Sequence, residues 1–214
     1  MPKPLGTCIA NRNGRATARH LEHRHRNAFE TDVAAAVARP SVGDESQRTV
    51  VLEVRMSMRL ERMTTATAAA LLGGQRPSDI EVASDYPTEF SKGVASQVAT
   101  GSELGPYVIY SPTESIVVGE IGGAFTGDGT VEIGYAIVKS HWGRGIATEA
   151  VRELVRRIAL RTDVQRVVAH TPLDRPQSAR VVEKAGFAFV REVEDTHEGA
   201  TLRVKEWELL TKAG

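Results

Sequence analysis

The chain has 214 residues, of which 41% are hydrophobic, with 27 basic and 27 acidic side chains and a single cysteine, Cys8. This length suits one domain with a buried core, and the balanced charge gives no electrostatic reason for binding nucleic acid or an anionic membrane. One cysteine excludes an intramolecular disulfide, and without a long apolar run or a signal-like start we expect a cytoplasmic protein that binds no membrane.

The first 50 residues carry many arginines and few large apolar side chains. Such a segment cannot bury enough apolar surface to offset the entropy lost on ordering, so residues 1–50 are expected to form a disordered basic tail. Its histidines, His20, His23 and His25, have no fourth ligand beside them, and we expect no metal site. Met56 and Met58 directly precede the first predicted strand, which leaves open that native translation starts there and that the tail is not native sequence.

A single domain is predicted over residues 58–211, with strands and helices alternating along it. Its first part is expected to contain a strand at 58–63, a helix at 64–72, a helix at 86–98, strands at 106–110 and 115–125, and a hairpin turn at 126–129. Its second part is expected to contain a strand at 130–138, a helix at 146–158, a strand at 166–170, a helix at 177–184, and strands at 187–194 and 201–209. This order predicts an α/β fold with a mixed sheet.

The most informative segment joins the strand at 130–138 to the helix at 146–158. Two glycines there let the backbone approach a ligand closely, and the first helical N–H groups have no partner within the helix. The helix dipole and one arginine add positive charge, so the segment favours the phosphate oxygens of a pyrophosphate. The residues predicted to bind it are Trp142, Gly143, Arg144, Gly145, Ile146, Ala147 and Thr148.

Two common phosphate-binding motifs do not fit this loop. A nucleoside triphosphatase loop needs a Lys followed by Ser or Thr after its last glycine, where this chain has Ile146 and Ala147. A dinucleotide-binding fold needs a third glycine and an acidic residue at the end of the next strand, and neither is correctly placed. Both classes of enzyme are therefore disfavoured.

The loop instead resembles the acetyl-CoA loop of the GNAT N-acetyltransferases, whose pattern is Gln or Arg, two residues, Gly, one residue, then Gly or Ala. Gly145 and Ala147 match this pattern, and Trp142 stands where it has Gln or Arg. This departure narrows the family, because the run 142–150 is similar to the branch that acetylates ribosomal-protein alanine termini. A second block at 178–187, which ends in Gly-Phe, is similar to the family's later helix. The resemblance implies a mixed, mostly antiparallel sheet flanked by helices, acetyl-CoA as co-substrate, an amine acceptor and no metal. It leaves a homodimer open.

The family reaction is direct attack of an amine on a thioester, which requires a general base. Glu132 is the candidate, because it lies in an apolar strand where burial would raise its pKa, and its place fits the family's strand-borne glutamate. The alternative is that Glu132 faces water or pairs with an arginine. The reserve candidates are His170, Glu194 and Glu198.

The departing thiolate needs a proton, which many family members supply from a tyrosine after the second block. No tyrosine follows Tyr135 here, so Ser178 is the candidate, with capping of its helix as the alternative role. By resemblance, a backbone N–H near Ile137 would bind the oxyanion and the pantetheine would pair there like an added strand. Arg175 stands where the family usually has an asparagine that serves the cofactor, and by this resemblance Arg175 is predicted to bind acetyl-CoA.

The acceptor is the least determined part of the prediction. The acidic residues Glu81, Asp85 and Glu89 would suit a cationic amine, or are simply solvated. A protein N-terminus and a small amine both remain open. The missing tyrosine and Arg175 also support an alternative, a non-catalytic sensor or interaction module that binds acyl-CoA without turnover.

Overall fold

The computed structural model describes residues 58–98, 102–197 and 200–211. The predicted tail at 1–50, its histidines, Cys8, Met56 and Glu198 lie outside these residues. The strands are β1 (Arg59–Arg62), β2 (Tyr107–Ser111), β3 (Ile116–Gly127), β4 (Thr130–Ile137), β5 (Arg166–Pro172), β6 (Ala188–His197) and β7 (Ala200–Leu210). The helices are α1 (Thr65–Leu72), α2 (Ser91–Ala95), α3 (Ile146–Ala159) and α4 (Pro176–Lys184), with a short 3-10 helix, η2 (Lys139–His141).

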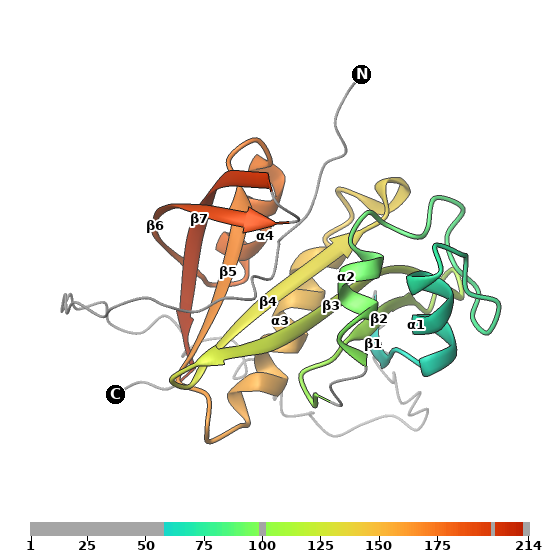
Figure 1. The fold of residues 1–214 in the computed structure, drawn as a ribbon, viewed down its shortest axis with the longest axis horizontal. Coiled ribbons are helices and arrows are strands. Elements are labelled where there is room, and N and C mark those ends of the chain that lie inside the picture. Colours follow the sequence, from blue (N-terminus) through green and yellow to red (C-terminus); the bar gives the residue numbers. More distant parts are fainter. Residues whose placement is uncertain (1–57, 99–101, 198–199, 212–214) are drawn as a thin grey trace, which may run out of the picture. The chain divides into compact units, whose positions relative to one another are not determined.

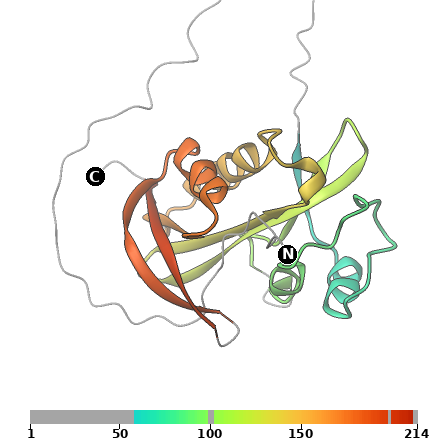
Figure 2. The same ribbon diagram turned by 90° about the horizontal axis from the view of Figure 1, so that it is seen from above.

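The seven strands form one sheet in the order β1-β2-β3-β4-β5-β7-β6. Every neighbouring pair is antiparallel except β4 and β5, which are parallel. Helices α3 and α4 lie on one face of the sheet, and α1 and α2 lie on the other (Figure 2). The predicted mixed, mostly antiparallel sheet flanked by helices is confirmed.

The parallel pair is short. Only Thr130–Ile133 of β4 pairs with 166–169 of β5, and beyond Ile133 and Ala169 the two strands are no longer registered. Figure 1 shows β4 and β5 diverging from this point. The sheet therefore contains a wedge-shaped gap between the carboxyl ends of its two central strands, and η2, the glycine loop and α3 follow directly from β4.

Helix α3 forms as its sequence pattern predicts. Its apolar stripe, Ile146, Ala150, Val151, Leu154 and Ile158, is buried in the core, and its charged residues lie on the other side. Each buried leucine or isoleucine side chain contributes about 1.5–3 kcal/mol relative to exposure, so this stripe fixes the helix against the sheet.

The predicted helix at 86–98 is wrong at both ends, and most of all over its first part, because α2 covers only Ser91–Ala95. Pro87 has no N–H to donate and restricts the residue before it. The backbone N–H of Thr88 is bonded instead to the Ser91 hydroxyl at 2.9 Å. Such side-chain bonds hold the backbone in a turn and so compete with helix formation.

One glycine in β3 has no space for any larger residue. A Cβ added at Gly119 would lie 2.2 Å from the carbonyl oxygen of Ala136, which belongs to the backbone of β4 and cannot rotate away. Gly119→Ala is therefore expected to lower the free energy of unfolding by about 3 kcal/mol or more, measured by urea denaturation.

Gly93 is the matched control for this substitution. It lies in α2, and a Cβ added there meets nothing within 4 Å. Gly93→Ala is expected to leave stability unchanged or raise it by about 0.5–1 kcal/mol. Equal effects at the two glycines would contradict the close approach of β3 to β4.

Within the described residues, no helix combines the length and the apolar character that crossing a membrane requires.

Candidate active site

The loop between η2 and α3 has the backbone conformation that its glycines allow. Gly143 and Gly145 have φ values of 77° and 81°, in the left-handed region that other residues rarely adopt. Gly145 is the N-cap of α3, and no side chain accepts a hydrogen bond from the first turn. The N–H groups of Ile146, Ala147 and Thr148 therefore start the helix without a side-chain cap, as an anion site requires.

Trp142 and Arg144 have partners that the sequence did not predict. The Trp142 indole N–H donates to the carbonyl oxygen of Ile137 at 2.7 Å, which ties the loop back to the end of β4. Arg144 donates to Glu114 at 2.7 Å and to the carbonyl of Ser140 at 3.2 Å. Its guanidinium is half exposed, so an incoming phosphate would compete with Glu114 for it.

The base of the loop is held by an acidic residue that was expected to serve the acceptor. Asp85 accepts hydrogen bonds from the backbone N–H of Ser140 at 2.9 Å and from its hydroxyl at 2.7 Å. The backbone and hydroxyl bonds from Ser140 outweigh burial and lower the pKa of Asp85. In this structure Asp85 thus anchors the segment that leads into the glycine loop.

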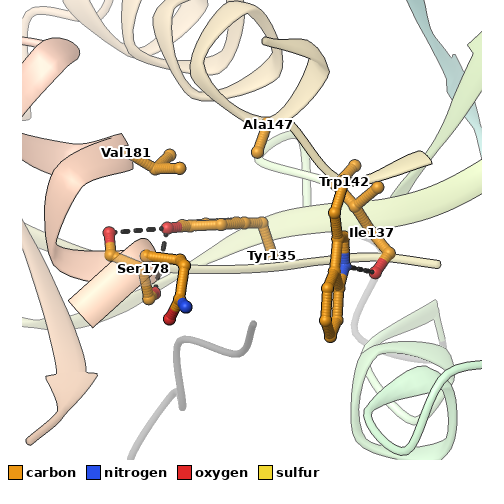
Figure 3. Close-up of a pocket in the computed structure, with 7 residues that line it drawn as sticks. Tyr135, Ile137, Trp142, Ala147, Ser178 and Val181 are labelled. Carbon is orange, nitrogen blue, oxygen red and sulfur yellow. Dashed lines mark hydrogen bonds between the residues drawn. The ribbon is translucent and has the colours of Figure 1, made fainter. Parts of the chain in front are cut away.

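A pocket lies on the α3 and α4 face of the sheet, beside the gap (Figure 3). Its lining joins the end of β4, the glycine loop and the first turns of the two helices, and consists of Tyr135, Ile137, Trp142, Ala147, Gln177, Ser178 and Val181. Four of these seven, Ile137, Trp142, Ala147 and Ser178, were predicted site residues. Tyr135 could have been found from strand alternation, because it lies two residues before Ile137 and therefore on the same face of β4.

Ser178 and Tyr135 contact each other in this pocket. Their hydroxyl oxygens are 3.0 Å apart, and the Tyr135 phenol also reaches the carbonyl oxygen of Ser178 at 3.1 Å (Figure 3). The alternative role for Ser178 as a helix cap is wrong. The N-cap of α4 is Arg175 and no side chain caps that helix. The Ser178 hydroxyl thus faces the pocket and the phenol.

Arg175 does not line the pocket. Its guanidinium donates to Glu89 at 2.9 Å, so Glu89, which was predicted to wall the acceptor site, is already paired with a cation. The prediction that Arg175 takes over a cofactor contact stays a prediction. In this structure it links α4 to the segment before α2.

Glu132 lies on the opposite face of the sheet from the pocket, because it alternates with Tyr135 along β4. It is only 3% exposed, so the alternative in which it faces water is wrong. One of its partners is His170, with His170 Nδ1 and Glu132 Oε1 2.9 Å apart. Another reserve candidate, Glu194, has an exposed side chain.

His170 lies at the edge of the gap, one residue beyond the last paired row of β5. Its Nε2 is 3.6 Å from Glu206 of β7, which pairs in turn with Arg191 of β6 at 3.2 Å. Burial would lower the pKa of His170, but its bonds to Glu132 and Glu206 outweigh burial and raise that pKa to about 9. The imidazole therefore releases its proton only in mildly alkaline solution.

A second buried carboxyl on this face was missed by the sequence reasoning. Glu120 of β3 is 0% exposed and accepts hydrogen bonds from the hydroxyls of Thr88 and Ser91. Burial raises its pKa to about 7. The only sequence signal was one acidic residue between apolar residues and glycines in the predicted strand at 115–125.

Glu120→Gln is expected to stabilise the protein in alkaline solution. Because folding raises its pKa from 4.5 to about 7, the unfolded chain ionises first, and the folded state loses stability as pH rises through 7. At pH 8 the free energy of unfolding should rise by roughly 2–3 kcal/mol in the variant. Urea denaturation at several pH values measures this. An equal increase in the free energy of unfolding of Glu120→Gln near pH 4.5 would show that ionisation of Glu120 is not the cause.

The described residues bring together no group of three or more His, Cys, Asp or Glu side chains that could hold a metal ion.

Comparison with known proteins agrees with this geometry. The sequence model of the acetyltransferase (GNAT) domain matches residues 57–188. Among solved structures, an acetyltransferase of the GNAT family from Bacillus anthracis is similar, with a TM-score of 0.55 and 17% identity over 73% of this chain and 96% of that one. A variant of the spermidine N-acetyltransferase SpeG from Vibrio cholerae has a TM-score of 0.54 and 13% identity over 72% of this chain and 94% of that one.

Two curated proteins are similar in sequence. The ribosomal-protein-serine acetyltransferase of Escherichia coli is 38% identical over 58 residues, which cover 27% of this chain and 32% of the relative. The uncharacterized N-acetyltransferase YjdG of Bacillus subtilis is 32% identical over 110 residues, 50% of this chain and 60% of the relative. The chain therefore spans about a third and about three fifths of these relatives.

The fold and the matched domain are those of an acyltransferase, with a glycine loop beside a sheet whose two central strands diverge. The chain belongs to the GNAT acetyltransferase family, and the family resemblance predicted from the two sequence blocks is confirmed.

Proposed function

We propose that the protein transfers an acetyl group from acetyl-CoA to a primary amine by direct attack. The observation that carries this proposal is the gap between β4 and β5, with the uncapped start of α3 and the pocket on one face and the Glu132–His170 pair on the other. Two substrates that approach from opposite faces can meet at such a gap.

The donor side is the face of α3 and α4. The N–H groups of 146–148 and the guanidinium of Arg144 suit the pyrophosphate of acetyl-CoA. The gap leaves the end of β4 near Ile137 without a neighbour in β5, so the pantetheine amides can pair there as an added strand. The pocket around Trp142 and Ala147 supplies apolar walls for that arm.

The acceptor side is the face of α1 and α2. The amine nitrogen attacks the thioester carbon, and a new C–N bond forms while the carbonyl oxygen becomes an oxyanion. A backbone N–H near Ile137 donates to that oxygen. The proton from the nitrogen passes to the Glu132–His170 pair, whose 2.9 Å bond orients the imidazole at the edge of the gap.

Loss of the thiolate completes the reaction. The C–S bond breaks, and the sulfur takes a proton from the Ser178 hydroxyl, which the Tyr135 phenol replaces through their 3.0 Å hydrogen bond. Ser178 and Tyr135 together thus protonate the thiolate. Many family members use a tyrosine after the second block for this step, whereas Tyr135 precedes that block.

Release of the CoA thiol tests the proposal. The full chain is mixed with acetyl-CoA and a panel of amines, and thiol formation is followed with a chromogenic disulfide. In parallel, acetyl-CoA at about 100 times its dissociation constant should stabilise the folded protein by roughly 2.7 kcal/mol, and ATP should not. Stabilisation without turnover for any amine would favour the sensor alternative, and neither effect would refute both.

A further inference from the structure

Asp195 of β6 is a buried carboxylate for which the described part of the chain supplies no hydrogen-bond donor. Its relative exposure is 4%, and neither carboxylate oxygen has a donor among the described residues. Burying a polar group without a hydrogen bond costs roughly 1–3 kcal/mol, and a charged group costs more. A ligand that donates a hydrogen bond to Asp195 would account for a residue that otherwise weakens the fold.

Asp195 lies on the acceptor face of the sheet, the face that carries His170. Along β6, Val193 pairs with Val204 of β7, which pairs with Pro172 of β5, and Asp195 follows Val193 by two residues. Alternation places Asp195 on the same face of the sheet as Val204 and Glu206, and therefore as His170. Asp195 also acts electrostatically on His170, where it is one of the groups that raise the imidazole pKa.

The charges around this position do not balance. Three carboxylates, those of Glu132, Asp195 and Glu206, share the region with the cations of His170 and Arg191. The two cations already contact Glu132 and Glu206, and Arg191 is 59% exposed. Among the residues that the structure describes, this group therefore contains one more carboxylate than cations, and Asp195 is the carboxylate without a hydrogen-bond donor there.

We infer that Asp195 binds a second cationic group on the acceptor, so that the preferred substrate is an amine that carries another positive charge beyond its reacting nitrogen. This inference rests on the proposed acetyl transfer. The reacting amine lies at the gap beside His170, and the second cation lies further along β6. Along β7, Leu202, opposite Asp195, lies four positions from Glu206, opposite His170. Four positions along an extended strand correspond to about 13 Å, and two strand spacings, about 10 Å in all, separate β6 from β5 across the sheet.

The test compares amines that differ only in the second charge. Diamines from diaminopropane to diaminooctane are each paired with the monoamine of equal chain length. The wild-type protein is expected to acetylate the best diamine with a kcat/KM about 10–100 times that of its monoamine, as a charge-assisted hydrogen bond allows. Asp195→Asn should remove this preference, so that the diamine and its monoamine react with similar kcat/KM.

Glu194→Gln is the matched control, because Glu194 is the exposed neighbour of Asp195 on the other face of β6. It should keep the diamine preference. Asp195→Asn is nearly isosteric and removes a buried charge, so its melting temperature should be equal to or higher than that of the wild type. Unfolding of Asp195→Asn is followed by circular dichroism, and Asp195→Leu provides a second variant in which the preference should also be lost.

Failure of this inference differs from failure of the proposed function. Equal rates for diamines and monoamines in the wild type would overturn the Asp195 inference while acetyl transfer stands. If no amine is acetylated, thermal stabilisation by a diamine that is lost in Asp195→Asn would still support the cation site. Stabilisation by Mg²⁺ or Ca²⁺ that depends on Asp195, with none from diamines, would overturn it.

A reacting amine with a second cationic group occurs both in small diamines and in peptides that have a basic residue after the N-terminal amine. A peptide beginning Ala-Lys is therefore compared with one beginning Ala-Gln. A preference for the lysine peptide that requires Asp195 identifies a protein N-terminus as the source of both charges, and a preference confined to diamines identifies a small molecule.

Discussion

Glu132→Gln is expected to lower kcat for acetyl transfer by about 10²–10⁴-fold while leaving the affinity for acetyl-CoA unchanged. The carboxylate is buried on the face away from the pocket and contacts His170 at 2.9 Å, so its loss affects proton transfer and not the donor site. Steady-state kinetics with a saturating amine measures kcat, and calorimetric titration measures the affinity.

The pH profile separates a proton-transfer role from a merely structural one. If neutral His170 accepts the proton, kcat/KM of the wild type should rise with pH until about 9, the pKa of that imidazole. A nearby carboxylate favours the imidazolium. Removing the Glu132 charge should therefore move the rise of kcat/KM to a pH lower by about 1–3 units.

His170→Gln is the control for this profile, since it removes the titrating group and should abolish the rise of kcat/KM with pH. If kcat/KM of Glu132→Gln rises at the same pH as in the wild type, the contact between Glu132 and His170 is not the origin of the pH dependence. A loss of acetyl-CoA affinity in parallel with kcat would mean that the substitution disturbs β4 and does not act on proton transfer.

Tyr135→Phe and Ser178→Ala are each expected to lower kcat by about 10²-fold, with little change in KM for acetyl-CoA. The two hydroxyls share one hydrogen bond, and each would supply the same proton to the leaving sulfur. Ser178→Ala keeps the backbone carbonyl that the phenol also contacts at 3.1 Å, so the phenol keeps a partner in the variant.

The double variant distinguishes one proton path from two separate effects. Groups that act as a unit are non-additive, so the double variant should lose about as much activity as the more damaging single one. Losses that multiply would contradict a shared path. Val181→Ala, which trims the same pocket without touching a hydroxyl, is the control for changes in pocket shape.

The donor side could be predicted because its signals are local in the sequence. Two glycines, an amphipathic stripe and the block at 178–187 each indicate their structure within a few residues, and strand and helix periods fixed most element boundaries. The helix predicted at 86–98 failed because the Thr88 and Ser91 side chains hydrogen-bond within a turn there, which periodicity does not reveal.

The acceptor side could not be predicted because its partners are distant in sequence. Glu132 and His170 are 38 residues apart, and Glu120 contacts Ser91 across 29 residues. Only the register of neighbouring strands brings these groups together. The same holds for Asp195, because only the folded structure shows that no described residue donates a hydrogen bond to it. A buried glutamate could be foreseen from the sequence, but its partner could not.

The close contact between Gly119 of β3 and Ala136 of β4 fixes one of the two strands that border the gap. Because the Ala136 carbonyl fits against Gly119 with no space for a methyl group, β4 is locked to β3 through rows that end beside Ile137. β5 is joined to β4 through four rows only and then continues into β7 and β6. The weakest strand pairing beside the gap is therefore that of β4 with β5, whereas the β4 side of the gap is held firmly by β3.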